Sequence, residues 1–170
     1  MRVYLLRHAE AVNRGTPGYP RDAERPLTDA GHEQARQVAA GLQQLKLELD
    51  VIVTSPYVRA AQTAEHVARV FGIRVPIREF EWLRPDIAPA DASRNLKVLA
   101  AHQGVLCVGH EPHLSGWVAE LCAGSGGMRC LMKKAGAACI EIETVPPRQG
   151  SGTLRWLLTP KQLTLIGRSS

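Results

Sequence analysis

Two arginines and two histidines occupy places in the chain from which they could act together on a phosphate group. Arg7 and His8 directly follow an apolar run of strand length. Arg59 comes shortly after a second such run, and His110 comes just after a third. In a parallel sheet the carboxyl ends of the strands lie along one edge, so we expect these side chains to converge. Guanidinium groups can bind phosphate oxygens bidentately, and an imidazole can act as a nucleophile.

His8 is the predicted nucleophile of this group. Positive charge on Arg7 and Arg59 disfavours protonation of a neighbouring imidazole, which would leave a lone pair free to attack phosphorus in line. Arg7, Arg59 and His110 would hold the equatorial oxygens and stabilise their charge in the transition state. Taken alone, the stretch around His8 could equally be an exposed polar turn, and the two later stretches favour the phosphate site.

Capping residues mark the helices that follow the first two strands. Thr28 is predicted to cap a helix whose apolar positions recur at helical spacing. Ser55 is predicted to cap a second helix, with the next residue, a proline, in its first turn. Arg59 would then also lie in that first turn, and Gly72 would end the helix.

The remaining elements complete an α/β pattern. A short strand is expected at 75–77, near an edge because it contains a proline, and a helix is expected to end near Gly104. Two further strands are expected at 137–144 and 153–158, at a sheet edge with one face exposed to solvent. This order predicts a three-layer α/β/α sandwich with a mainly parallel central sheet and an antiparallel edge. At this length we expect one domain, residues 1–170.

Composition narrows the classes of function. The chain is 45% hydrophobic and 22% charged, as in an ordinary globular protein. A net charge of +5 suits an anionic substrate, and 5% aromatic residues are too few for a base-stacking surface, so we expect no nucleic-acid partner. The four cysteines have no C-x-x-C spacing. Without a signal peptide or a long apolar run, we expect a cytoplasmic protein without membrane contact.

The loop at 12–25 is a candidate cover for the site. Its basic residues Arg14, Arg21 and Arg25 suit a segment that folds over an anion, and Arg21 and Arg25 are candidate substrate ligands. A mobile surface loop is an equally good interpretation. No cofactor or metal is expected, because the pair His110 and His113 has no third candidate ligand.

Four motifs in order resemble those of the histidine phosphatase superfamily, which includes the phosphoglycerate mutases. They are residues 6–10, similar to R-H-G-E; 27–35, similar to L-T-x-x-G-x-x-Q-A; 55–63, similar to S-x-x-x-R-A-x-Q-T; and 108–111, similar to V-G-H. Within the superfamily, the short chain and the segment 109–121 look most like the SixA-type phosphohistidine phosphatases.

That resemblance implies a phosphoglycerate mutase-like fold and an activity. It implies a metal-independent phosphatase that removes a phosphoryl group from phosphohistidine on a protein, through a covalent phosphohistidine on His8. It also implies a partner, a histidine phosphotransfer domain of two-component signalling. We expect the protein to be a monomer.

Two departures from the family pattern bear on mechanism. Ala9 stands where a glycine is usual, and Trp82 stands where many ester-cleaving relatives have an acidic glutamate. Glu79 and Glu81 flank that position and are the possible general acids. Imidazole leaves more easily than an alkoxide once its ring is protonated, so a weak or absent acid favours phosphohistidine as substrate.

Two alternatives remain at this point. One is a broad-specificity phosphomonoesterase that acts on small phosphate esters with Glu79 or Glu81 as the acid. The other is a non-catalytic phosphate-binding adaptor, against which the presence of both histidines and both arginines argues. Glu10 and Glu111 could orient the site electrostatically or could simply be solvated.

Overall fold

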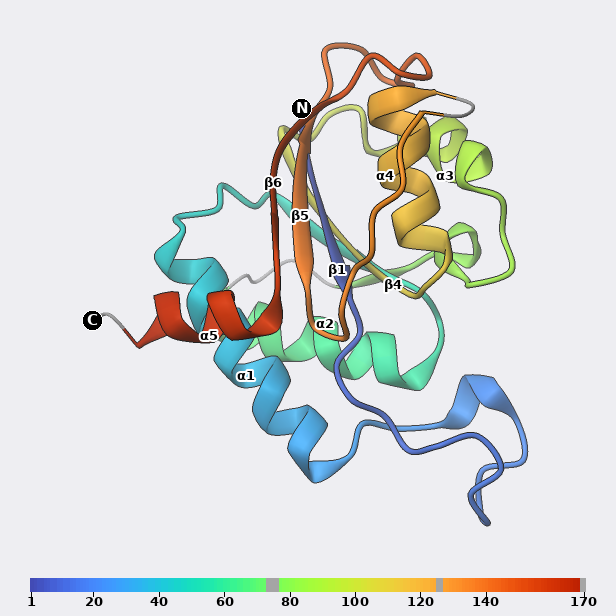
Figure 1. Ribbon diagram of the computed structural model, residues 1–170, viewed down its shortest axis with the longest axis vertical. Helices are drawn as coiled ribbons and strands as arrows, with labels where there is room; N and C mark the ends of the chain where they lie inside the picture. Colours follow the sequence, from blue (N-terminus) through green and yellow to red (C-terminus); the bar gives the residue numbers. More distant parts are fainter. Residues whose placement is uncertain (73–76, 125–126, 169–170) are drawn as a thin grey trace.

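In the residues that the structure describes, 1–72, 77–124 and 127–168, a mixed six-stranded sheet lies between two layers of helices (Figure 1). The structure is a computed structural model. Its strands are β1 (Arg2–Arg7), β2 (Val51–Thr54), β3 (Arg78–Glu79), β4 (Gly104–Gly109), β5 (Ala137–Glu141) and β6 (Thr153–Leu158). They are ordered β3-β2-β4-β1-β5-β6; β1 to β4 run parallel, and β5 and β6 pair antiparallel. The predicted three-layer sandwich with an antiparallel edge is confirmed.

The helices bury the two faces of the sheet separately. They are α1 (Asp29–Gln44), α2 (Val58–Phe71) and α5 (Pro160–Gly167) on one face, and α3 (Pro89–Asn95) and α4 (His113–Ala123) on the other. Because side chains alternate along a strand, Tyr4 and Leu6 of β1 pack towards the first group of helices. Val3 and Leu5 pack towards the second group. This central strand is therefore held from both sides, and the residues at its carboxyl end are fixed with it.

The start of α2 differs from the prediction. The helix begins at Val58, so Ser55 is not its N-cap and the proline after it lies outside the helix. The hydroxyl of Ser55 accepts the Tyr57 N–H at 3.3 Å and also lies 2.9 Å from a ring nitrogen of His110, and the chain at Tyr57 stays extended. Arg59 nevertheless lies in the first turn, as predicted.

Other boundaries were predicted with mixed success. The Thr28 cap is confirmed, since its side chain accepts the N–H of Gly31, and Gly72 ends α2 in the left-handed conformation. Residues 75 and 76 of the expected strand lie outside the described residues, and the strand in that region is β3. Of the stretch 137–144, only Ala137–Glu141 forms a strand.

Helix α5 was not predicted. Thr159 and Gln162 form a capping box at its start, in which each side chain accepts a hydrogen bond from the backbone N–H of the other. The helix lies so close to α1 that a Cβ atom at Gly41 would be 2.1 Å from the carbonyl oxygen of Leu163. Such a short helix is stabilised mainly by this packing, which its own sequence does not reveal. In the described ranges, no helix is both long and apolar enough to cross a membrane.

Candidate active site

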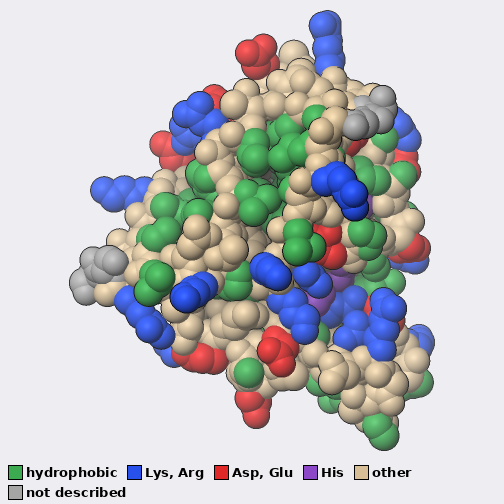
Figure 2. Space-filling view, in the orientation of Figure 1, with side chains coloured by type: hydrophobic (Ala, Val, Ile, Leu, Met, Phe, Trp, Pro, Cys, Tyr) green, Lys and Arg blue, Asp and Glu red, His purple; other side chains and the backbone are tan. Residues whose placement is uncertain are grey.

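A cavity of about 250 Å³ opens where β1 and β4 end. Among the described residues it is lined by Arg7, His8, Ala11, Asn13, Arg14, Arg25, Arg59, Pro85, His110, Glu111 and Lys134. The structure therefore brings together the four residues that the sequence placed in a phosphate site. Figure 2 shows Lys and Arg side chains gathered around histidine on this part of the surface.

His8 lies at the base of this cavity with a defined tautomer. Its ring Nδ1 is 2.7 Å from the carbonyl oxygen of Ala9, and its Nε2 is 3.2 Å from Nε of Arg59. A carbonyl can only accept and an arginine can only donate, so Nδ1 carries the proton and Nε2 carries a lone pair. Burial and the charges of Arg59 and Arg7 lower the pKa of His8 to about 3. The imidazole is therefore neutral at physiological pH.

Arg59 connects the nucleophile to the loop at 12–25. Its side chain is buried, and besides His8 it donates to the backbone carbonyl of Asp22 at 2.6 Å and to the Asp22 carboxylate at 2.9 Å. The guanidinium carbon also lies 5.0 Å from the centre of the Tyr57 ring, within cation–π range. Burial lowers the pKa of Arg59, and the bond to Asp22 opposes that effect.

Asp22 gathers three arginines around the cavity. Its Oδ1 accepts hydrogen bonds from Nε of Arg14 and Nε of Arg25, both at 2.9 Å, while its Oδ2 accepts from Arg59. Burial alone would raise the pKa of Asp22, but hydrogen bonds from Arg25, Arg59 and Arg14 outweigh it and hold that pKa well below its usual range. The loop thus lies against the site. Arg21 does not line the cavity; its side chain is 78% exposed and pairs with Glu24.

His110 faces His8 across the cavity. The two ring centroids are 5.0 Å apart, and Nε2 of His110 is 2.9 Å from the hydroxyl of Ser55. Its Nδ1 is buried without a hydrogen-bond partner. Burial, then the neighbouring His8 and Arg59, lower the pKa of His110 to about 2. A neutral ring in this position has one N–H, which could be donated to a phosphoryl oxygen.

Arg7 completes the cationic wall. One terminal nitrogen donates to the carbonyl of Met132 at 2.8 Å, whereas its Nε is buried without a partner. Burial lowers the pKa of Arg7, and the nearby Glu111 opposes that effect. A buried unpaired donor is costly, so a bound anion that accepted from this Nε would relieve that cost.

The two possible general acids lie away from the cavity. Glu79 and Glu81 are exposed, and Glu81 pairs with Arg84 at 3.1 Å. Neither is among the residues that line the cavity in the described part of the chain. The acidic residue in that lining is Glu111. Glu111 is held in place, because its two oxygens accept from the Met132 N–H and from the Ser115 hydroxyl.

Ala9 is accommodated without crowding the cavity. Its side chain is fully buried in the core formed with α1 and α2, and its N–H donates to the Thr63 hydroxyl at 3.1 Å. The methyl group in place of the usual glycine therefore packs into the core.

Three further histidines lie outside the cavity lining given above. Both ring nitrogens of the buried His113 lack partners, and no group of three or more His, Cys, Asp or Glu within the described ranges could hold a metal ion. His32 and His66 form a pair with 2.9 Å between ring nitrogens.

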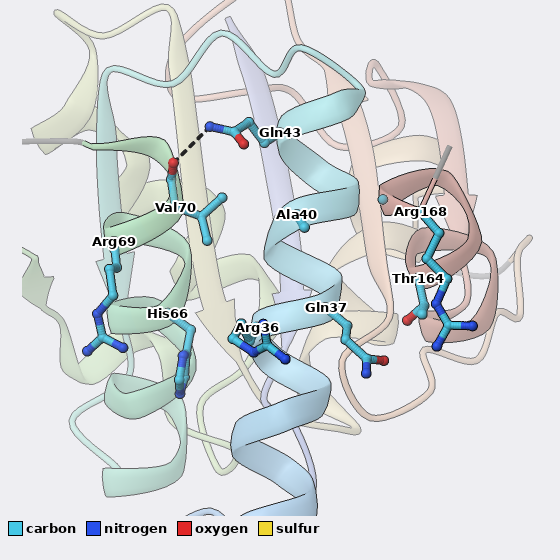
Figure 3. A pocket seen from close by; sticks show the side chains of 10 residues that line it. Arg36, Gln37, Ala40, Gln43, His66, Arg69, Val70, Thr164 and Arg168 are labelled. Carbon is cyan, nitrogen blue, oxygen red and sulfur yellow. Dashed lines mark hydrogen bonds between the residues drawn. The ribbon is translucent and has the colours of Figure 1, made fainter. Parts of the chain in front are cut away.

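A second, larger hollow of about 520 Å³ lies across the outer surfaces of α1, α2 and α5 (Figure 3). Arg36 comes from α1, His66 and Arg69 come from α2, and Arg168 follows α5. None of the residues predicted for the phosphate site lines it, and Arg36 is already paired with Glu33.

Sequence reasoning missed several residues of the site, among them Asp22, Lys134 and Thr63. Asp22 is an acid among the arginines of its loop, which is a weak signal for an ion-pair network. Lys134 carries no motif, and it reaches the cavity only because of the turn after Met132. Thr63 lies one helical turn after Arg59, a spacing that could have placed it on the same face of α2.

Comparison with known proteins identifies the family. The model of the histidine phosphatase superfamily (branch 1) matches residues 3–84. The phosphohistidine phosphatase SixA of Escherichia coli K12 is 27% identical over 167 residues, which cover 97% of this chain and 98% of that protein. The chain belongs to the histidine phosphatase superfamily.

Two further comparisons extend this result. A structure of the protein histidine phosphatase SixA complexed with tungstate superposes with a TM-score of 0.82 at 28% identity, covering 96% of this chain and 99% of that one. An uncharacterized protein of Picosynechococcus is 34% identical over 80% of this chain and 82% of its own length. The family match and the similarity to SixA indicate a phosphatase of the histidine type.

Proposed function

We propose that this protein hydrolyses phosphohistidine on a protein substrate, through a covalent phosphohistidine on His8. One observation carries the proposal: Nε2 of His8 bears a lone pair, lies against Arg59, and faces a cavity lined by cations. The similarity to SixA, which is named a phosphohistidine phosphatase, supports the choice of substrate.

The first step transfers the phosphoryl group to His8. Nε2 attacks phosphorus in line, a P–N bond forms to His8, and the P–N bond to the substrate imidazole breaks. Arg59 then exchanges its bond to Nε2 for a bond to a phosphoryl oxygen. Arg7 and His110 donate to the other oxygens, whose charge they stabilise. The electron pair of the broken bond stays on the leaving imidazole nitrogen.

The second step returns the enzyme to its starting state. Water attacks the phosphorus of phospho-His8, and the P–N bond to Nε2 breaks. The products are inorganic phosphate and a neutral His8 that keeps its proton on Nδ1, while the protons of the attacking water stay on phosphate or pass to solvent. Over the two steps, phosphohistidine and water become histidine and phosphate.

The leaving group favours this substrate over a phosphate ester. A phosphohistidine ring can be protonated on its free nitrogen before the P–N bond breaks, and neutral imidazole then departs without an acid from the enzyme. An alkoxide needs a proton donor, but Glu79 and Glu81 lie outside the cavity, and both oxygens of Glu111 already accept hydrogen bonds. Hydrolysis of small phosphate esters is therefore the less favoured activity.

A fixed nucleophile argues against a non-catalytic adaptor. Anion binding alone requires Arg7 and Arg59 but not an imidazole with a defined tautomer at their centre. We further propose a histidine phosphotransfer domain of two-component signalling as the substrate, with the protein acting as a monomer. The four cysteines are free, which fits the cytoplasm as its compartment.

The test compares two substrates and two variants. Wild-type protein should hydrolyse a histidine phosphotransfer domain phosphorylated on its histidine with a kcat/KM about 100-fold or more above that for p-nitrophenyl phosphate, a difference of about 3 kcal/mol. His8→Ala should abolish turnover of the phosphoprotein, whereas His102→Ala serves as a matched control, because His102 precedes the start of β4 and His110 follows its other end. Faster turnover of the ester would favour the phosphomonoesterase, and full activity of His8→Ala would contradict the mechanism.

A further inference from the structure

We infer that a hollow beside the phosphoryl cavity binds an acidic segment of the substrate, adjacent to its phosphorylated residue. The hollow measures about 590 Å³ and is lined by Arg7, Gln34, Lys133, Lys134, Thr159, Pro160 and Lys161. It shares Arg7 and Lys134 with the cavity that contains His8. A polypeptide whose phosphorylated side chain reaches His8 would therefore place its neighbouring residues in this hollow. The inference rests on the proposed function.

The charge of the hollow selects the kind of segment. Its lining in the described residues includes four cations and no carboxylate. Lys133, Lys134 and Lys161 are exposed, and none of the ion pairs in that part of the chain includes them. Several exposed arginines elsewhere are paired with a carboxylate. Unpaired cations on one wall attract carboxylates of a partner and speed its approach.

The turn that carries Lys133 and Lys134 is connected to the strand end at His8 by backbone hydrogen bonds. The Ala135 N–H donates to the carbonyl oxygens of Arg7 and of His8, each at 3.1 Å, and the Arg7 N–H donates to the carbonyl of Gly136 at 3.0 Å. Ala135 is buried and has a φ of 55°, a conformation that costs energy for a residue with a side chain. The turn that carries Lys133 and Lys134 is therefore held at a set position relative to His8.

The opposite wall is also fixed. Lys161 lies in the first turn of α5, whose start is held by the capping box of Thr159 and Gln162. Gln34 of α1 reaches back to accept the N–H of Glu10 at 3.1 Å. Both walls are thus rigid backbone with flexible lysine side chains at the rim, an arrangement that suits recognition of charge rather than of one exact sequence.

The test uses two synthetic peptides of equal length, each with one phosphohistidine. One has aspartate and glutamate on both sides of that residue, and the other has glutamine and serine. Wild-type protein should prefer the acidic peptide in kcat/KM, and the preference should weaken as ionic strength rises. The double variant K133Q/K161Q should lower the acidic-to-neutral ratio about fivefold, as expected for the loss of two exposed charge pairs.

A matched variant separates a local effect from a loss of overall charge. The double variant R69Q/R168Q removes the same two charges from the hollow on α1, α2 and α5 (Figure 3) and should keep the wild-type ratio. Equal ratios for wild type and K133Q/K161Q, or an equal fall in both double variants, would overturn the inference and leave the proposed function standing. Failure of wild type to hydrolyse either peptide would overturn both.

Discussion

Nε of Arg59 donates a hydrogen bond to Nε2 of His8 over 3.2 Å. The other ring nitrogen of His8 donates to the carbonyl of Ala9. The arginine therefore marks the ring atom that carries the lone pair, and it lies where a phosphoryl oxygen would need a cation. In the proposed mechanism one guanidinium first orients the nucleophile and then stabilises the group that it attacks.

Arg59→Lys should lower kcat/KM for phosphoprotein by about 100-fold or more, because a lysine cannot replace the fork of donors on a transferring phosphoryl group. Steady-state kinetics would measure the loss. Arg69→Lys, an exposed position on the same helix, is the control and should stay close to wild type. A loss of less than about threefold in Arg59→Lys would show that its charge alone suffices.

The ring of His8 should remain neutral across the physiological range. Burial lowers its pKa to about 3, whereas an ordinary histidine has a pKa near 6.5. The nitrogen NMR signals of this ring should therefore stay those of a neutral imidazole protonated on Nδ1 as the pH falls from about 8 to about 5. A titration step of His8 near pH 6.5 would contradict this prediction.

His113→Leu should stabilise the protein. His113 is buried with both ring nitrogens unpaired and a pKa lowered to about 4, mainly by burial. Below pH 6.5 the unfolded chain takes up a proton at this residue that the folded chain does not, so its presence reduces stability as pH falls. The free energy of unfolding should rise by about 1 kcal/mol at pH 7 and by about 2 kcal/mol more at pH 5.

Urea denaturation of His113→Leu at the two pH values measures this change. A variant that is less stable than wild type at both would show that the ring fills its site better than an aliphatic side chain does. A gain that does not grow at the lower pH would show instead that His113 is not protected from protonation by folding.

Asp22→Asn should loosen the loop at 12–25 from the site. The carboxylate joins Arg14, Arg25 and Arg59, and an amide cannot provide the charge that this arrangement balances. We expect kcat for phosphoprotein to fall about tenfold, because the charge-assisted hydrogen bond that positions Arg59 would be weakened. Kinetics would measure this, with Asp91→Asn as the control, because Asp91 pairs with Arg94 in the first turn of α3 and does not line the cavity. Unchanged kcat would mean that the loop is positioned without Asp22.

The site was predictable where regular structure positions it. Arg7, His8 and His110 lie at the ends of strands whose apolar runs are plain in the sequence, and parallel pairing brings such ends together. The fold class followed from the same strand and helix pattern. The sequence predicted the first residue of α2 wrongly but placed Arg59 correctly in the first turn of the helix. Either start of the helix leaves Arg59 next to the end of β2 and therefore beside the cavity.

Irregular segments were harder to predict. Asp22 reaches Arg59 through a loop with no periodic pattern, so its three partners could not be inferred. Lys133 and Lys134 depend on a turn whose conformation is set by contacts with β1. Helix α5 is short and depends on packing against α1. In each case the deciding contact joins residues far apart in the sequence.

Detection of phosphate bound to His8 would be the decisive observation. Wild-type protein mixed with a phosphohistidine phosphotransfer domain and quenched in alkali should contain an acid-labile, alkali-stable phosphate on the peptide that includes His8, identified by mass spectrometry. His8→Ala should contain none and should release no phosphate from the substrate. Phosphate release by His8→Ala at the wild-type rate, or phosphate found on His110 instead, would contradict the proposed mechanism.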